Sequence, residues 1–453
     1  MQAMLAEIWR ALGGPDRLAG HVEEEGQGSL ASSFDISDFA AATTASAGLA
    51  LAEFVEARFG VLPAVSANRR LASLWFAKSI RPIGWSLPDP WDPIAGNYAA
   101  RDGWVRLHTN APHHRAAALS VLHVEADRAA VARAVAQWSA QDLEDAVVEA
   151  GGCAAKLRTL EEWREHPQGR AVQAEDLVAW RPNGARKLRE FGSRERPLEG
   201  LRVLDLTRVL AGPVATRFLA GYGADVLRID PPFWDEPGVL PEVTPGKTRA
   251  RLDLRGAADR EIFASLLSEA DVLVHGYRSD ALERIGFGAA EREMLSPGLI
   301  DVALDAYGWT GPWARRRGFD TVVQMSAGLA AREMAFFKSA EPKQTAVQAL
   351  DYGTGYMAAA AVLRALTQQA RDGQGRAARL SLARTADCLA AYPSAAGERS
   401  IEERQDDLDT TIEPTHWGPA RRLKSPVRIE ACEMRFERGA GPLGDGTPGF
   451  ARG

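Results

Sequence analysis

The sequence predicts an α/β protein in which a doubly wound, mostly parallel sheet is joined to a smaller helical α+β domain. Two observations carry this prediction. Residues 198–400 alternate short β-branched runs with stretches of helical period, which is the pattern of successive βαβ units. Residues 96–180 contain one strand-like run, "DGWVRLHT", and then turn to helical text such as "RAAVARAVAQWSAQDLEDAVVEAG". The larger region is therefore expected to be Rossmann-like and the smaller one mainly helical.

The larger region can be followed element by element from its amino end. A strand at "LRVLDLT" (201–207) precedes a helix at "PVATRFLAGYGA" (213–224) and a second strand at "DVLRID" (225–230). After a Pro-rich loop, "TRARLDL" (248–254) alternates as a strand does. The alternation of strands and helices then continues as far as the alanine-rich run after Asp351.

The other segments differ in composition from both domains. Residues 1–95 suggest a helical N-terminal segment, residues 181–197 a charged linker, and residues 401–453 an extended tail that wraps over a surface without its own core. A shift of 313 residues also lays "DFAAATTASAGLALAEFVEARFG" (38–60) on "DYGTGYMAAAAVLRALTQQARDG" (351–373). The N-terminal segment is therefore either a degenerate, structural copy of the second stretch or an alanine-rich helix that aligns by chance.

Composition and charge exclude several classes of protein. The chain has 453 residues and a formal net charge of -6 with acids and bases intermixed, so no basic face for nucleic acid is expected. No apolar run approaches the ~20 residues that span a bilayer, so no membrane segment is expected. The three cysteines lie far apart, and the histidines of "HTNAPHHR" (108–115) have no Cys or acid at ligand spacing, so no metal site is expected. The expectation is a cytoplasmic protein.

The first strand, loop and helix of the larger region favour an anionic ligand. They carry no G-x-G-x-x-G phrase, so a cradle for a nicotinamide or flavin pyrophosphate is not expected. Free N–H groups at a helix start nevertheless favour phosphates. A nucleotide-bearing ligand at the carboxyl ends of the strands is therefore physically reasonable.

Several phrases occur in the order typical of one family. They are "LRVLDLTRVLAGPVATRFLAGYGADVLRIDPP", "GKTRARLDL", "DVLVHGYRSDALERIGFG", "AYGWTGPWARRRGFDTVVQMSAGLA" and "ALDYGTGYMAAAAVLRAL". Together they resemble the class III CoA-transferases, a family that includes formyl-CoA and carnitine-type CoA-transferases and α-methylacyl-CoA racemases. The resemblance implies coenzyme A as a substrate, acyl-CoA and a small carboxylic acid as partners, and an interlocked homodimer. It departs from the family in order, because here the small domain precedes the sheet domain.

Asp351 is the candidate nucleophile by this resemblance. Its carboxylate would attack the thioester of an acyl-CoA and form an anhydride, and then an aspartyl-CoA thioester. The backbone amides of Gly353 and Gly355 are candidate donors to the oxyanion. From the residues alone, Asp351 is equally well explained as a helix N-cap, a position that would also keep the acid ionised.

Four residues are candidates for contact with coenzyme A. Arg278 in "HGYRSD" matches the family's phosphate-binding Arg, and Arg208 and Val209 lie in the loop before the first helix, where main-chain contact is expected. Lys247 in "PGKTR" matches the family's Gly-Lys. Each of the charged residues is alternatively a solvated surface side chain, which is also the expectation for the arginine run 315–317.

Two alternatives to CoA transfer stay open at this stage. Racemases of the family carry a His directly before the Asp of "RGFDTVVQ", whereas this chain has Phe319 before Asp320, so the second base of a racemase is missing. A non-catalytic CoA-binding homologue is the other alternative. "DPPFWDEPGVLPEVTPG" also replaces the family's Gly-Asp-x-x-Arg phrase, and Gly151-Gly152 is the nearest candidate for a glycine lid.

Overall fold

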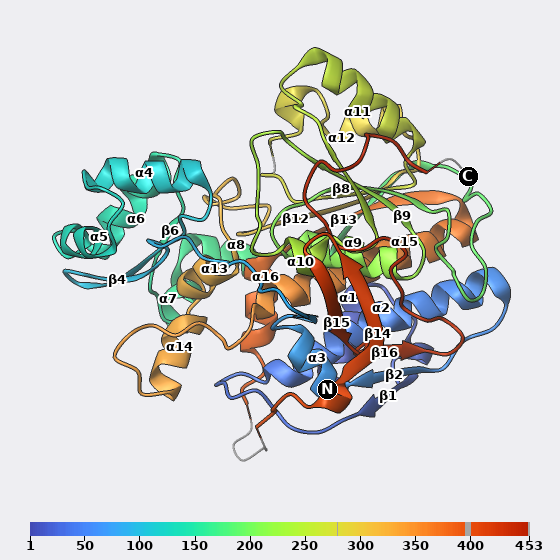
Figure 1. The fold of residues 1–453 in the computed structure, drawn as a ribbon, viewed down its shortest axis with the longest axis horizontal. Coiled ribbons are helices and arrows are strands. Elements are labelled where there is room, and N and C mark those ends of the chain that lie inside the picture. Colours follow the sequence, from blue (N-terminus) through green and yellow to red (C-terminus); the bar gives the residue numbers. More distant parts are fainter. Residues whose placement is uncertain (279, 395–399, 452–453) are drawn as a thin grey trace.

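The computed structural model describes residues 1–278, 280–394 and 400–451. Figure 1 shows a large α/β body and a smaller lobe, which carries helices α4 to α6 and lies to one side of it. None of the described helices is both long and apolar enough to cross a bilayer.

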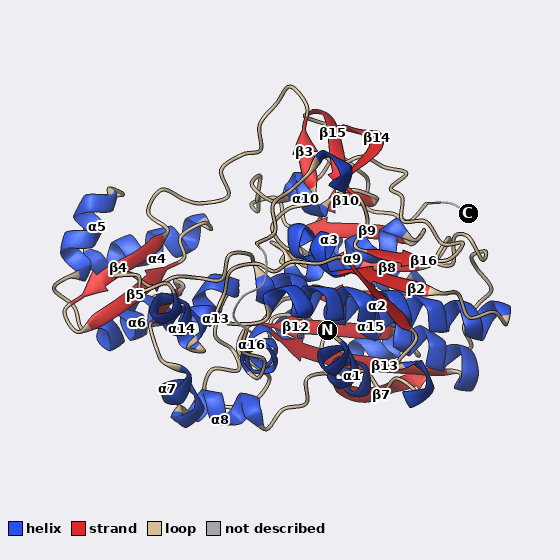
Figure 2. Cartoon of the chain, turned by 90° about the horizontal axis from the view of Figure 1, so that it is seen from below, coloured by secondary structure: helices blue, strands red, loops and turns tan. Residues whose placement is uncertain are grey.

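A seven-stranded sheet forms the centre of the large body (Figure 2). In spatial order its strands are β10 (Lys247–Arg251), β9 (Asp225–Asp230), β8 (Arg202–Leu206), β11 (Val272–His275), β12 (Ile300–Asp305), β13 (Gln374–Ser381) and β7 (Ala179–Ala185). All neighbours are parallel except β7, which runs antiparallel to β13. The first six strands follow the doubly wound order 3-2-1-4-5-6. The predicted fold class is therefore confirmed.

The helices that alternate with or follow these strands in the chain belong to the large body. They are α9 (Ala211–Gly221), α10 (Leu240–Val243), α11 (Ala257–Glu269), α12 (Ala289–Leu295), α13 (Asp320–Ser326), α14 (Leu329–Phe336), α15 (Ala349–Asp372) and α16 (Leu382–Ala390). The central strands β8, β9, β11 and β12 are almost wholly buried, which explains their near-continuous apolar runs.

The smaller lobe has a core of its own, which includes Val105, Leu107, Val131 and Leu143. Its elements are β4 (Gly96–Ala100), β5 (Gly103–Leu107), β6 (Ala154–Lys156), α4 (Pro112–Leu122), α5 (Arg128–Val135) and α6 (Ala140–Glu149). The next two helices, α7 (Leu160–Glu165) and α8 (Pro167–Gln173), pack on the core of the large body through Trp163 and Val172. The predicted linker 181–197 is wrong at its start, because 181–185 belong to β7. An edge strand tolerates the Pro182 and Gly184 that made this stretch resemble a loop.

The N-terminal segment and the tail are built together. The first contributes α1 (Gln2–Ala11), β1 (Val22–Glu25), α2 (Ile36–Phe59), β2 (Val65–Asn68), α3 (Arg69–Trp75) and β3 (Ile80–Pro82), and the second contributes β14 (Leu408–Thr415), β15 (Gly418–Leu423) and β16 (Val427–Ile429). β16 pairs with β2, and β15 pairs with β3. The tail was predicted only to wrap over a surface. In the structure it also completes two small sheets.

Helices α2 and α15 pack against each other in the core, as Figures 1 and 2 show. Each has 24 residues and ends at a left-handed glycine, Gly60 or Gly373. Their N-cap residues have nearly the same backbone angles, φ -79° and ψ 67° at Asp35 and φ -77° and ψ 65° at Gln348. Each residue of α2 therefore has a counterpart in α15 that lies 313 residues later in the chain, which is also the separation between Asp38 and Asp351.

Candidate active site

The largest opening beside Asp351 lies where the strand order of the sheet reverses, between β8 and β11. Arg208 and Val209 follow β8, and Tyr277 and Arg278 follow β11. These four residues and Asp351 line a cavity of about 530 Å³, which we call the switch-point groove. Open α/β sheets bind their ligands at this position.

The groove is strongly cationic. The Arg208 guanidinium lies between two rings, 4.7 Å from the centroid of Trp234 and 4.9 Å from that of Tyr277, and donates to the Tyr277 hydroxyl at 3.2 Å. Arg278 and Arg317 line the same space. Burial, and after it the charge of Arg278, lower the pKa of Arg317. Like charges held together in this way favour an anionic ligand.

Arg317 was not predicted to bind a ligand, because a run of three arginines is typical of a solvated loop. The structure separates the three side chains. Arg315 is exposed, whereas Arg316 and Arg317 both line the groove, and Arg316 is also paired with Glu144 at 2.6 Å. The run lies directly before the "GFD" phrase, and that proximity to Asp320 was the available signal.

Asp351 is the third residue of α15, so the prediction that it caps the helix is wrong. The cap comes from another element, because Oδ2 of Asp320 accepts the N–H groups of Leu350 at 2.8 Å and Asp351 at 3.0 Å. The Asp351 side chain itself makes no hydrogen bond with any part of the chain that the structure describes. It is 7% exposed, which leaves it accessible only from the cavities it lines.

The electrostatics of Asp351 also differ from the prediction. Burial, and after it the neighbouring Asp320 carboxylate, raise the pKa of Asp351 well above its usual value. Burial likewise raises the pKa of Asp320 to about 6. The favourable field of the helix start is therefore outweighed, and the two acids hold a proton in mildly acidic solution.

A second space opens on the other side of Asp351. This inner cavity of about 270 Å³ is lined by Asp351, Asp320, Val209, His108 and Phe319, among others. The His108 ring stacks on Phe319 with centroids 4.0 Å apart, and its Nδ1 finds no partner among the described residues. Burial lowers the pKa of His108 well below its usual value, so the ring is neutral.

Gly353 and Gly355 do not have the predicted role. Both lie inside α15, where their N–H groups donate within the helix and are not free for an oxyanion. A side chain at Gly353 would collide with the Phe39 ring, and one at Gly355 with the carbonyl of Ala211. The two glycines therefore let α15 approach α2 and α9.

Lys247 does not reach the groove, so its predicted contact with coenzyme A is wrong. Its ammonium is 0% exposed and donates to Oδ2 of Asp205 at 3.0 Å, Oγ1 of Thr216 at 2.6 Å and the Pro213 carbonyl at 2.9 Å. Burial lowers its pKa to about 8. Lys247 instead ties β10 to β8 and α9.

Val209 is held in an unusual conformation between the two cavities. Its φ of 62° is left-handed, which strains a β-branched residue. The Glu236 carboxylate accepts the Val209 N–H at 2.9 Å and Trp234 Nε1 at 2.8 Å, and it pairs with Arg228. Glu236 belongs to the phrase that replaces the family's Gly-Asp-x-x-Arg, so this departure builds the loop that carries Val209.

The fold and the groove define an α/β protein that can hold an anionic ligand beside a buried carboxyl group. Residues 198–417 match the model of CoA-transferase family III. The chain is similar to an acetyl-coenzyme A transferase, nodX, from Hypoxylon pulicicidum (39% identity over 186 residues, 40% of this chain and 31% of the relative). It is also similar to the succinyl-CoA:glutarate CoA-transferase of Mus musculus (32% identity over 193 residues, 40% of this chain and 44% of the relative).

Among solved structures, the chain is similar to the crystal structure of Rv3272 from M. tuberculosis. That comparison gives 29% identity and a TM-score of 0.39, and it covers 43% of this chain and 57% of the other. The chain thus spans less than half the length of the two curated relatives named above.

Proposed function

We propose that the protein is a CoA-transferase, which moves coenzyme A from an acyl-CoA to a carboxylic acid with Asp351 as the nucleophile. The single observation that carries this proposal is the position of Asp351. Its unbonded carboxyl group lines both the cationic groove and the inner cavity. Coenzyme A in the groove would bring its thioester to this carboxyl group, with the acyl chain in the inner cavity.

The reaction balances without any further reagent. The Asp351 carboxylate attacks the thioester carbon, the C–S bond breaks, and an aspartyl-acyl anhydride and CoA thiolate form. The thiolate attacks the aspartyl carbonyl and releases the donor acid, which leaves an aspartyl-CoA thioester. The acceptor carboxylate then attacks the aspartyl carbonyl, the C–S bond breaks, and a second anhydride and CoA thiolate form. The thiolate attacks the acceptor's acyl carbon to give the new acyl-CoA and the free Asp351 carboxylate.

The chain offers other residues for binding and for the oxyanion. Arg208, Arg278 and Arg317 would hold the phosphates of coenzyme A, since guanidinium groups bind phosphate bidentately. The N–H groups of Leu210 and Ala211, at the start of α9, line the groove and have no acceptor among the described residues. They replace Gly353 and Gly355 as candidate oxyanion donors.

Hydroxylamine trapping tests the nucleophile. Wild-type protein mixed with an acyl-CoA and hydroxylamine should yield a peptide with a hydroxamate at Asp351, identified by mass, and Asp351→Asn should yield none. A screen of acyl-CoA donors against succinate-like acceptors then identifies the substrates. Turnover that persists in Asp351→Asn would exclude the mechanism.

One observation favours a second candidate, racemisation of an acyl-CoA. The neutral His108 ring lies in the same cavity as Asp351 and could exchange an α-proton in place of the missing His at position 319. Deuterium wash-in at the α-carbon without an acceptor acid, lost in His108→Gln, would support this reaction. Its absence would leave CoA transfer alone.

The assembly and the location of the protein are also proposals. The resemblance to the family supports a homodimer, although the order of the domains lets one chain pack two matching helices together. Native mass measured at several protein concentrations tests this point. A cytoplasmic location stays a prediction from composition.

A further inference from the structure

The match between α2 and α15 extends to the elements around them. Each helix is followed by a strand, β2 or β13, whose last residue caps the next helix. Asn68 accepts the N–H of Leu71, and Ser381 accepts the N–H of Arg384. Asn68 and Ser381 are separated by the same 313 residues as Asp38 and Asp351.

The neighbouring strands match as well. The order β1-β2-β16 repeats the order β12-β13-β7, with a parallel and then an antiparallel neighbour in both. Glu25 lies opposite Asn68 as Asp305 lies opposite Ser381. The strands of the N-terminal segment and the tail, β1, β2 and β16, thus have the same arrangement as β12, β13 and β7 of the main sheet.

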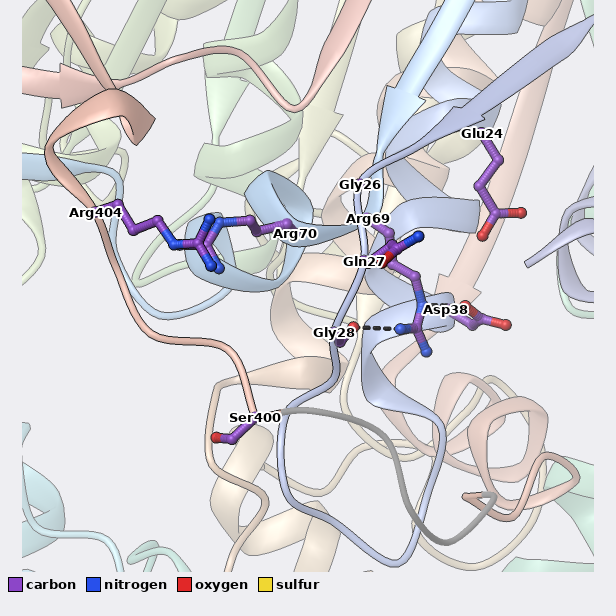
Figure 3. Close-up of a pocket in the computed structure, with 9 residues that line it drawn as sticks. All are labelled: Glu24, Gly26, Gln27, Gly28, Asp38, Arg69, Arg70, Ser400 and Arg404. Atoms are coloured by element: carbon purple, nitrogen blue, oxygen red, sulfur yellow. Dashed lines mark hydrogen bonds and ion pairs between the residues drawn. The ribbon is translucent and has the colours of Figure 1, made fainter.

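The sheet of β1, β2 and β16 also has a cavity in the corresponding place. This Asp38 cavity, of about 750 Å³, lies at the carboxyl ends of β1 and β2 (Figure 3). Two of its lining residues, Glu24 and Gly26, correspond through the sheet register to Leu304 and Ala306. Two others, Asp38 and Arg69, lie 313 residues before Asp351 and Leu382. All four counterparts line the switch-point groove. Equivalent backbone positions therefore form two separate ligand-sized spaces.

One exchange changes the chemistry of the second space. Arg69 stands where the other copy has Leu382, and its Nε donates to Oδ1 of Asp38 at 2.5 Å. Burial opposes ionisation of Asp38, but the chain's amino group and Arg69 outweigh it and lower the pKa of this carboxyl below its usual value. Asp38 is therefore a paired anion and a poor nucleophile.

Two further arginines add positive charge to the cavity. Asp407 holds Nε and Nη2 of Arg70 at 3.1 and 2.6 Å, which leaves Nη1 without a partner among the described residues. Arg404 is exposed and forms no direct ion pair in the part of the chain that the structure describes. Figure 3 shows its side chain pointing toward Arg70. Two guanidinium groups arranged in this way favour a bidentate anion.

We propose that the Asp38 cavity is a second ligand site, which binds a small anion carrying phosphate or carboxylate groups and does not transfer it. Arg70 and Arg404 hold the anion, while Arg69 neutralises Asp38. The site does not depend on the reaction at Asp351.

The test uses the full chain with the switch-point groove weakened by Arg278→Ala and Arg317→Ala, so that the second site is measured alone. Calorimetry with inorganic pyrophosphate and, separately, with succinate should detect binding of at least one probe, and the tighter one identifies the chemistry. Adding Arg404→Glu should weaken that binding at least tenfold, whereas the matched exposed change Arg255→Glu should not. Asp38→Asn should tighten it, since a negative charge is removed.

Absence of binding in the weakened background, or equal binding with and without Arg404→Glu, would overturn the proposal. Arg404→Glu in the otherwise unchanged chain should leave hydroxamate trapping at Asp351 intact. The failure of the second site is thereby distinguished from failure of the CoA-transferase mechanism.

Discussion

The copy around Asp351 and the copy around Asp38 share a backbone and differ in chemistry. In both, an acid in the first turn of a 24-residue helix lies at the carboxyl ends of parallel strands. The Asp351 carboxyl group is unpaired, and burial and then the neighbouring Asp320 carboxylate raise its pKa, while Leu382 lines the same groove. Beside Asp38 stands Arg69, which pairs with it. The comparison teaches that the neighbour of the acid, more than its place in the fold, decides whether it can react.

The largest effect is expected from the acid itself. Asp351→Asn should lower the rate of CoA transfer about 10³-fold or more, because no other group can form the anhydride. Asp38→Asn, the matched change in the other copy, should leave this rate unchanged in a steady-state assay. Equal losses in both variants would contradict the difference between the copies.

Asp351→Asn should also change the stability of the folded protein. Because the folded-state pKa of Asp351 lies above its unfolded value, the folded protein loses stability as pH rises from the unfolded pKa through the folded pKa. Asp351→Asn removes this penalty. Its Tm should exceed that of the wild type near neutral pH, and the difference in Tm should shrink toward pH 4.

Lys247→Ala tests the buried ion pair between Lys247 and Asp205, which lies in the seven-stranded sheet. Removing one partner leaves Asp205 charged and unpaired, which should cost about 3–5 kcal/mol of unfolding free energy in urea titrations. The exposed Lys187→Ala is the control. A raised KM for acyl-CoA with unchanged stability would instead place Lys247 at the ligand.

Leu382→Arg would introduce the Asp38 arrangement at Asp351. The new guanidinium should pair with the carboxyl group, lower its pKa and reduce its nucleophilicity, with a loss of activity of about 100-fold. Leu382→Met keeps the volume and should retain activity. Full activity in Leu382→Arg would show that the neighbour does not separate the two copies.

Arg278→Ala should raise KM for acyl-CoA about tenfold or more with little change in kcat, because a charge-assisted phosphate contact contributes about 1.5–3 kcal/mol. Arg255→Ala, an exposed arginine paired with Asp253, serves as the comparison. The expected pattern is lost if kcat falls and KM does not.

The smallest effect concerns pH. After burial, the charge of Asp320 raises the pKa of Asp351, so Asp320→Asn should move the acidic limb of the kcat/KM profile to lower pH. Asn can still accept the N–H groups of Leu350 and Asp351, which keeps the helix start in place. A shift toward higher pH would contradict the coupling of the two acids.

The sheet could be predicted from sequence because its central strands, β8, β9, β11 and β12, are buried on both faces and therefore form apolar runs. Arg208, Val209, Arg278 and Asp351 come together as expected, since each follows a strand or begins a helix at one edge of the sheet. The family's phrases identified these four residues in the sequence, and the order of the strands in the sheet brings them to the same groove.

The residues that were misassigned have contacts set by distant segments. Lys247 points at α9, and nothing in "PGKTR" specifies that neighbour. Gly353 packs against Phe39, more than 300 residues away in sequence. Arg317 was not predicted as a binding residue, because periodicity does not distinguish the inward side chains of Arg316 and Arg317 from the exposed Arg315.

The pairing of α2 with α15 inside one chain has a consequence for how the protein can vary. At the interface of a symmetric dimer, every substitution occurs twice and must suit both subunits. Here a change in α2 or α3 occurs once and leaves the partner helix untouched. One half of the molecule is thereby free to acquire an arginine that the other half could not tolerate.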